Sequence, residues 1–224
     1  FVNFSVKYRE DTEIVLKNIS FHIQPGEKVG VCGRTGSGKS TICLCLFRIL
    51  EAVSGQILID NEDISKIGLD LLRRNLTIIP QDPCLLEGTL KYNIDPFNKN
   101  QNEDIIKILK DIGFEYTEPD DKIMDKMIEQ GGSNLSVGQK QLVCIARALL
   151  RKSKIVVMDE ATANIDMNTE QIIQKALNLV LENSTVITVA HRIKTIINYD
   201  KIWVLDAGEV KEFDSPNNLL KNEN

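Results

Sequence analysis

The stretch Lys28-Val29-Gly30-Val31-Cys32-Gly33-Arg34-Thr35-Gly36-Ser37-Gly38-Lys39-Ser40 decides the fold of this chain. Residues 28–32 have the apolar character of a buried strand, and residues 33–40 complete the pattern Gly-x-x-x-x-Gly-Lys-Ser. Glycines let the backbone turn tightly, so that several N–H groups and the positive end of the following helix point at phosphate oxygens. We therefore expect a phosphate-binding loop between a strand and a helix.

This loop predicts a nucleoside triphosphate as ligand, together with Mg²⁺. Lys39 would reach the β- and γ-phosphates, and the Ser40 hydroxyl would coordinate the cation. A chance match by a glycine-rich turn is the alternative, and the strand that precedes the loop disfavours it. A dinucleotide-binding fold is disfavoured too, because it requires the pattern Gly-x-Gly-x-x-Gly. If Gly36 and Gly38 were its first two glycines, the third would fall at position 41, which is Thr41.

The composition agrees with one α/β domain or two associated lobes. The 224 residues are 42% hydrophobic, which allows a sizeable core. The formal net charge of −5 and the scattered lysines argue against the concentrated basic face that a nucleic-acid-binding surface usually needs. We therefore expect no nucleic-acid partner. The cysteines form no Cys-x-x-Cys pair and mostly lie among apolar residues, which predicts reduced, buried thiols at Cys32, Cys43, Cys45, Cys84 and Cys144.

No apolar run approaches the roughly 20 residues that cross a bilayer, and no signal peptide is visible. The sequence begins at Phe1 without a methionine. We therefore expect a fragment of a longer protein.

Strand and helix patterns surround the loop. Apolar and polar residues alternate from Val2 to Tyr8, and strand-like patterns return at 15–23, 28–32, 56–60, 76–80, 154–158 and 185–190. A helix is expected at 41–50, directly behind the loop. Within a predominantly helical stretch from about 90 to 150, the clearest helices are expected at 104–112 and 139–150.

The apolar run 154–158 ends in two carboxylates, Asp159 and Glu160. Such a run is typical of a strand covered on both faces, and ligands of open α/β sheets gather at the carboxyl ends of strands. Asp159 would orient Mg²⁺ through its water shell, and Glu160 would polarise the attacking water. Taken without the rest of the sequence, the two acids could equally well only solvate the end of the strand. The presence of the phosphate loop favours the functional interpretation.

The separation between Lys39 and Asp159 far exceeds the roughly dozen residues of a minimal crossover between parallel strands, so we expect a helical subdomain inserted at about 84–152. Within it, residues 135–139 place a hydroxyl and a flexible glycine at a helix start. Ser136 and Gln139 form a capping box, which by itself needs no ligand. A helix amino terminus is also an anion site suited to a γ-phosphate, although a loop on a separate lobe need not reach its own nucleotide.

One ordered set of motifs runs along the chain: the phosphate loop, Gln81, residues 135–139, residues 158–160, Asp166 and His191. This set resembles that of ABC ATPase domains, over essentially the whole chain. Residues 33–36, 79–83, 93–97 and 159–163 are similar to the multidrug resistance-associated (ABCC) subfamily, and Val137 and Glu160 make the second nucleotide-binding domain of such transporters the most similar. The resemblance implies an α/β fold: a P-loop ATPase with a RecA-like core, an antiparallel β-subdomain and an inserted helical subdomain.

The resemblance also implies a function. The chain would be the ATP-hydrolysing, Mg-dependent motor domain of an ABCC-type exporter, at the cytoplasmic face of a membrane. A second nucleotide-binding domain, expected in the same polypeptide, would clamp ATP head to tail with it, and transmembrane domains would contact the loop around Gln81. Two alternatives are open: a regulatory nucleotide sensor of a channel or receptor, and a soluble ATPase of DNA repair or translation, which the acidic charge disfavours.

Individual residues receive roles from the same resemblance. The chain's own ATP would be bound by Tyr8, Gly33, Arg34, Thr35, Gly36, Ser37, Gly38, Lys39, Ser40, Thr41 and Gln81. The signature segment would face the partner's ATP and comprises Leu135, Ser136, Val137, Gly138 and Gln139. Mg²⁺ would be held by Ser40, Gln81 and Asp159.

The remaining roles concern catalysis and the dimer. Glu160, His191 and Lys39 would serve hydrolysis, and Asp166 would lie in a loop at the dimer seam. Tyr8 keeps two alternatives, stacking on adenine or packing in the core, because the alternation from Val2 places it on the same face as the apolar strand residues.

Overall fold

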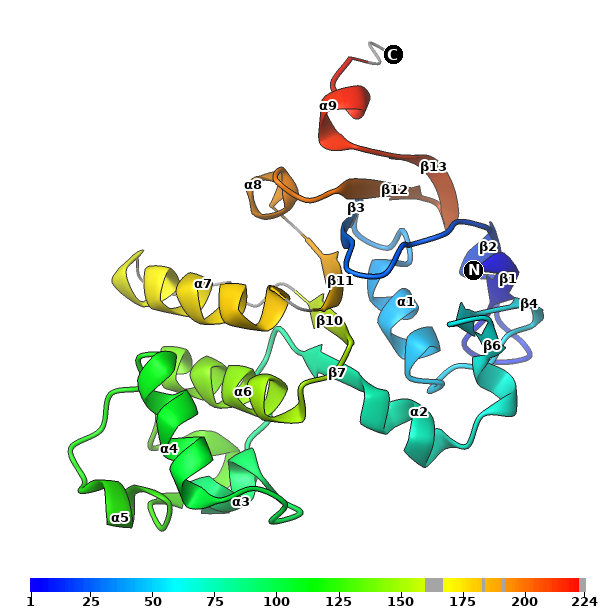
Figure 1. Ribbon diagram of the computed structural model, residues 1–224. Helices are drawn as coiled ribbons and strands as arrows, with labels where there is room; N and C mark the ends of the chain where they lie inside the picture. Colours follow the sequence, from blue (N-terminus) through cyan, green and yellow to red (C-terminus); the bar gives the residue numbers. More distant parts are fainter. Residues whose placement is uncertain (160–166, 183, 191, 222–224) are drawn as a thin grey trace. The chain divides into compact units, whose positions relative to one another are not determined.

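The computed structural model describes residues 1–159, 167–182, 184–190 and 192–221. It consists of two compact units (Figure 1). The first unit contains Phe1–Thr77, Lys154–Asp159 and the chain from Ser184 onward. The second unit contains Ile78–Ser153 and helix α7, Met167–Leu181.

Within the described residues, a six-stranded sheet has the order β13-β12-β3-β11-β10-β7, and all of its residues except Ile78 and Ile79 of β7 belong to the first unit. Strands β3, β10, β11 and β12 are parallel, whereas β13 pairs antiparallel with β12. The parallel strands are largely buried, as expected for strands covered on both faces. The bounds are β3 Lys28–Gly33, β7 Leu76–Ile79, β10 Ile155–Asp159, β11 Thr185–Val189, β12 Lys201–Asp206 and β13 Glu209–Asp214.

A second, antiparallel sheet has the order β2-β1-β4, with β1 at Val2–Val6, β2 at Leu16–Ile19 and β4 at Ser54–Gln56. The register of β1 shifts against both neighbours, and Asn3 has a left-handed φ of 48°. The predicted alternation from Val2 to Tyr8 is therefore wrong. Residues 4–6 are buried consecutively, whereas Val2 is exposed and Tyr8 lies beyond the strand.

Left-handed backbone turns end two of the predicted elements early. The helix expected at 41–50 is α1, Lys39–Leu46, which stops before Arg48 with φ 48°. The strand expected at 56–60 is split between β4 and β5, and β5 turns into β6 through Asp60 and Asn61, with φ of 51° and 67°. The other short elements are β5 Leu58–Ile59, β6 Glu62–Asp63, the 3₁₀ helix Ile64–Lys66, α2 Leu69–Asn75, α8 Ile193–Ile196 and α9 Pro216–Leu219.

One hydrophobic core joins the two sheets of the first unit to α1. Trp203 on β12 is fully buried in it, and the ring of Phe21 packs 4.1 Å from the Trp203 ring. From α1, Ile42 and Leu46 enter the same core. The start of α1 is therefore anchored by its own buried face.

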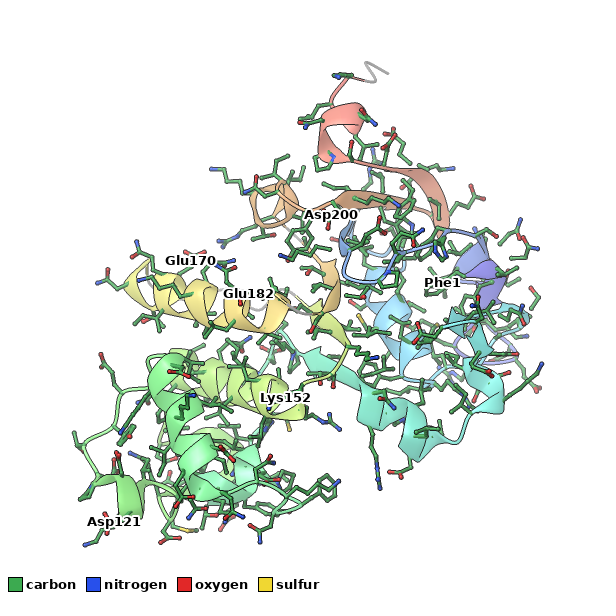
Figure 2. All side chains as sticks on the ribbon, viewed as in Figure 1. Phe1, Asp121, Lys152, Glu170, Glu182 and Asp200 are labelled. Carbon is green, nitrogen blue, oxygen red and sulfur yellow. The ribbon has the colours of Figure 1, made fainter. Side chains whose placement is uncertain are left out.

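The second unit is mainly helical, as Figure 1 shows in green and yellow. Helix α6 packs against α3, α4 and α7, and Figure 2 shows Lys152 just after the end of α6 and Glu170 and Glu182 toward the two ends of α7. No helix in the described part of the chain is both long and apolar enough to cross a membrane. The remaining bounds are α3 Leu90–Ile94, α4 Asn102–Asp111, α5 Asp120–Ile123, α6 Val137–Arg151, β8 Gly88–Thr89, β9 Met127–Ile128 and the 3₁₀ helix Gln130–Gly132.

The cysteines only partly follow their prediction. All five are free thiols, and Cys43, Cys45 and Cys144 are buried. Cys32 is half-buried and Cys84 is exposed. The prediction of burial is therefore wrong for Cys84, which lies between β7 and β8 in a segment without helix or strand.

Candidate nucleotide-binding site

The loop between β3 and α1 has the backbone that its glycines predict. Gly38 is the N-cap of α1 with a left-handed φ of 102°, and a Cβ at this position would lie 2.7 Å from Cδ2 of Leu16. Both the conformation and the contact require glycine. A glycine cap offers no side chain, and no described side chain caps α1. The first N–H groups of α1 are thus left without a side-chain cap at the positive end of the helix dipole.

Lys39 is folded back onto this loop. Its side chain is buried, and Nζ donates hydrogen bonds to the carbonyl oxygens of Gly33 at 2.9 Å and Arg34 at 3.0 Å. Ser37 N–H also donates to the Arg34 carbonyl, at 3.1 Å. The ammonium group is therefore held at the loop by uncharged oxygen atoms that a phosphate could replace as acceptors.

Ser37 contributes a second polar group to the loop. Its Oγ atom is buried and has no hydrogen-bond partner among the described residues. An unsatisfied buried hydroxyl costs about 1–3 kcal/mol. The loop thus carries a polar group whose hydrogen bond the described chain does not supply.

Tyr8 lies next to the first turn of α1 and not in the core. Its side chain is 48% exposed, and its hydroxyl shares a hydrogen bond of 3.0 Å with Oγ1 of the buried Thr41. Either oxygen atom can be the donor. The core-packing alternative is therefore wrong, and the exposed ring remains a candidate for stacking on a base.

Asp159 ends β10 at the same edge of the sheet as the loop. Val189 on β11 pairs with Asp159 on one side and with Val31 on β3 on the other. Burial, followed by the charge of Asp159, raises the pKa of the Cys43 thiol on α1 to about 12. The charge of Asp159 therefore acts on Cys43, a residue of the helix that begins at the phosphate loop.

Three predicted residues lie outside the described part of the chain: Glu160, Asp166 and His191. The structure fixes a neighbour of His191, because Ala190 N–H donates to the Val31 carbonyl at 2.9 Å. Within the first unit, the loop residues Arg34, Thr35, Gly36 and Ser40 are exposed. In the second unit, Gln81 is exposed in a bend after β7.

The signature segment forms the start of α6. Ser136 is its N-cap: Oγ accepts from Gln139 N–H at 3.1 Å, and Ser136 N–H donates to Oε1 of Gln139 at 3.1 Å. The predicted capping box is confirmed. Leu135 is buried and Val137 is 54% exposed.

Gly138 is needed for packing and not for flexibility. It has helical backbone, and a Cβ there would lie 2.2 Å from Cγ2 of Thr169 on α7. The expectation of a flexible glycine is therefore wrong. The small residue lets α7 approach the first turn of α6 closely.

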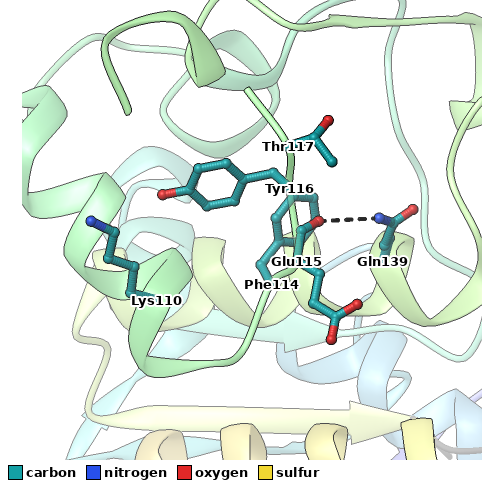
Figure 3. Close-up of a pocket in the computed structure, with 6 residues that line it drawn as sticks. All are labelled: Lys110, Phe114, Glu115, Tyr116, Thr117 and Gln139. Carbon is teal, nitrogen blue, oxygen red and sulfur yellow. Dashed lines mark hydrogen bonds between the residues drawn. The ribbon is translucent and has the colours of Figure 1, made fainter. Parts of the chain in front are cut away.

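Gln139 also forms one wall of an open pocket of about 660 Å³ (Figure 3). Its Nε2 atom donates to the Glu115 carbonyl at 3.4 Å, the dashed line in that figure. The side-chain amide thus closes the capping box and holds the segment that follows α4. The pocket is lined by Lys110, Phe114, Glu115, Tyr116, Thr117 and Gln139.

Sequence reasoning missed two polar residues of α6, Gln141 and Arg147, which bond to the chain on either side of Gln81. For Gln141, the signal was a polar residue on the apolar face of a helix. Gln141 is 1% exposed on the apolar face of the helix, and a buried polar side chain indicates a hydrogen-bond partner.

The described residues fit ATP and Mg²⁺. The uncapped start of α1, the buried Ser37 hydroxyl and the Lys39 ammonium are hydrogen-bond donors, as phosphate oxygens require. Mg²⁺ prefers oxygen ligands and is usually held by one or two carboxylates together with substrate phosphates. The Ser40 hydroxyl and the Asp159 carboxylate both offer oxygen atoms as ligands for Mg²⁺.

Comparison with known proteins agrees with this site. The family model described as ABC transporter matches residues 16–163. The chain is 53% identical to ATP-binding cassette sub-family C member 3 of Rattus norvegicus, over 98% of this chain and 14% of that protein. It is 50% identical to bile pigment transporter 1 of Saccharomyces cerevisiae, over 98% of this chain and 15% of that protein. The chain thus spans about a seventh of the length of these curated relatives.

A solved structure confirms the predicted ABC-type α/β fold. The structure of a bacterial Atm1-family ABC exporter with ATP bound superimposes with a TM-score of 0.90 at 36% sequence identity, and the match covers 100% of this chain and 39% of that chain. The family match extends over more than half of the chain and includes the phosphate loop. The chain therefore belongs to the ABC transporter family and is an ATPase domain of the ABCC type.

Proposed function

We propose that this domain binds and hydrolyses Mg-ATP as the motor of an ABCC-type exporter, at the cytoplasmic face of its membrane, and that it is the second nucleotide-binding domain of that transporter. The observation that carries the proposal is the start of α1, where the helix lacks a side-chain cap among the described residues and Ser37 Oγ has no described partner. A bound triphosphate supplies acceptors for both. Val137 and Glu160 support the assignment to the second domain.

ATP binding is assigned to the first unit. Lys39 would exchange the Gly33 and Arg34 carbonyls for β- and γ-phosphate oxygens, because a charged acceptor strengthens the hydrogen bond. The backbone of residues 33–41 would surround the phosphates. Tyr8 would stack on the adenine while its hydroxyl stays bonded to Thr41.

Hydrolysis is in-line attack of water on the γ-phosphorus. Glu160 would accept the hydrogen bond of the attacking water and orient it, His191 would bond to the γ-phosphate, and Lys39 would stabilise the charge of the transition state. When bound, Mg²⁺ would neutralise charge on the β- and γ-phosphates. Ser40, Gln81 and Asp159 would hold that cation.

The partners follow from the signature segment and from Gln81. Residues 135–139 would face the ATP of a second nucleotide-binding domain, and Asp166 would lie at the seam between the two domains. Ser136 is suited to this task because its hydroxyl hydrogen can still be donated while Oγ accepts from Gln139 N–H. The segment around Gln81 would contact the transmembrane domains of the transporter.

The test is Mg-ATP hydrolysis by the purified domain as a function of protein concentration, with Glu160→Gln as the matched variant. We expect a rate that rises faster than linearly, because two copies would have to combine a phosphate loop with a signature segment. The variant should keep ATP binding and lose about 10²- to 10⁴-fold in rate, the usual contribution of general-base catalysis.

Two outcomes contradict parts of the proposal. Unchanged turnover in Glu160→Gln would remove this residue from the mechanism. Tight ATP binding without hydrolysis at any concentration, in the isolated domain and also after addition of the other nucleotide-binding domain of the transporter, would show a nucleotide sensor and not a motor.

A further inference from the structure

A buried asparagine organises the chain after Gln81. Asn93 on α3 is 2% exposed. Its amide nitrogen donates to the carbonyls of Leu86 at 2.8 Å and Thr89 at 3.1 Å, and its Oδ1 accepts from Leu86 N–H at 2.9 Å. One side chain therefore fixes the backbone at Leu86 through both its N–H and its carbonyl group.

Arg147 on α6 ties this asparagine to the segment nearer Gln81. Its guanidinium donates to the Cys84 carbonyl at 2.8 Å, to the Asn93 carbonyl at 2.5 Å and to Oδ1 of Asn93 at 3.2 Å. These bonds use the planar fork of arginine, which a lysine cannot reproduce. The chain at Cys84, three residues after Gln81, is therefore attached to α6.

Gln141 attaches the chain on the other side of Gln81. It is 1% exposed on the buried face of α6, and its Nε2 donates to the Pro80 carbonyl at 3.3 Å. Pro80 immediately precedes Gln81 in the sequence. The exposed Gln81 thus lies between two backbone carbonyls, those of Pro80 and Cys84, which are both bonded to the same helix.

We propose that Gln141 and Arg147 are positioning residues that hold the Gln81 segment, residues 80–84, on the helix that begins with the signature. Gln81 and the signature segment then move as one body, so that a force on the segment reaches the start of α6. The part of this proposal that concerns the reaction rests on the proposed role of Gln81 as a Mg²⁺ ligand. The attachment itself rests on the hydrogen bonds of the second unit alone.

The test compares Arg147→Lys and Gln141→Met with the unchanged domain. Both variants keep approximate side-chain size and good helix propensity, and each removes donors to the segment. Arg74→Lys is the matched control, because Arg74 is exposed on α2 and pairs only with the nearby Asp70 among the contacts of the described residues. Amide hydrogen exchange and ATPase kinetics are measured on each protein.

Hydrogen exchange tests the attachment without any need for activity. Leu86 N–H should exchange about 10-fold faster in Arg147→Lys, because the asparagine that binds it loses charge-assisted hydrogen bonds. Exchange at Ile112 N–H, bonded to the Ile108 carbonyl at 3.0 Å at the end of α4, should remain the same. Equal acceleration at both sites, or none at Leu86, would overturn the attachment.

Kinetics tests the positioning role. Arg147→Lys and Gln141→Met should each lower kcat by about 3- to 10-fold and leave KM for ATP within about twofold, because the loop that binds ATP is untouched. Combined with Gln81→Ala, either variant should add no further loss, since it acts through Gln81. Multiplicative losses would overturn positioning through Gln81. A domain without any hydrolysis would instead contradict the proposed function, while the exchange experiment would still decide the attachment.

Discussion

The starts of α1 and α6 follow similar patterns of glycine and serine, yet they solve the problem of a helix amino terminus in opposite ways. At α1, the cap is Gly38 in a left-handed conformation and the nearby Ser37 hydroxyl has no partner within the described residues. At α6, the cap is Ser136, which exchanges two hydrogen bonds with Gln139. One start has no side-chain cap among the described residues, whereas the other is capped by its own side chains.

The glycines of the two starts also differ in purpose. Gly38 is required by its backbone conformation and by the closeness of Leu16. Gly138 has ordinary helical backbone and is required because Thr169 of α7 occupies the space of a side chain. A glycine at a helix start can therefore be required by its backbone conformation, by packing or by both, and only the surroundings of its Cα atom distinguish these cases.

The largest expected effect concerns the charge at the α1 start. Lys39→Ala should weaken ATP binding by about 10- to 100-fold, because a hydrogen bond to a charged group contributes about 1.5–3 kcal/mol. Titration with a fluorescent ATP analogue measures the effect. Lys66→Ala, which removes an exposed lysine distant in sequence from the loop, is the control. Tight ATP binding by Lys39→Ala would show that the two helix starts do not differ in the way proposed.

A smaller effect is expected at the packed glycine of α6. Gly138→Ala gains about 1 kcal/mol of helix propensity but overpacks the contact with Thr169, which costs about 1–3 kcal/mol. We expect a net loss of about 1 kcal/mol in the free energy of unfolding, measured by urea denaturation. Adding Thr169→Ser removes the clashing methyl group and should restore stability. Failure of this second change to restore it would contradict a packing role for Gly138.

The smallest loss of stability is expected for one member of a matched pair of serines, Ser136 and Ser37. Ser136→Ala removes a satisfied N-cap and should lower the stability of the nucleotide-free domain by about 1 kcal/mol, or its Tm by about 2–4 °C. Ser37→Ala removes a buried hydroxyl without a described partner, and with it the desolvation cost of that group, so it should not lower the Tm without nucleotide. Thermal unfolding without and with ATP measures both. Equal losses without nucleotide would mean that Ser37 Oγ has a structural partner.

Local patterns predicted the elements of the candidate site and failed where a turn or a distant contact intervened. The strand 28–32, the helix behind the loop and the capping box of α6 were predictable, because each depends on residues close together in sequence. The end of α1 depends on the left-handed conformation of Arg48, which its residue type does not indicate. The position of Tyr8 was ambiguous because a register shift in β1 cancels simple alternation.

The sequence by itself determined the family, the phosphate loop and the acidic end of β10, because short motifs fix backbone chemistry locally and need no distant partner. Only the tertiary structure decided that Gly138 faces Thr169, that Tyr8 bonds to Thr41 and that Arg147 holds the chain after Gln81. These contacts join residues that are far apart along the chain. Their geometry follows from how helices and strands pack, and no local pattern of residue types records it.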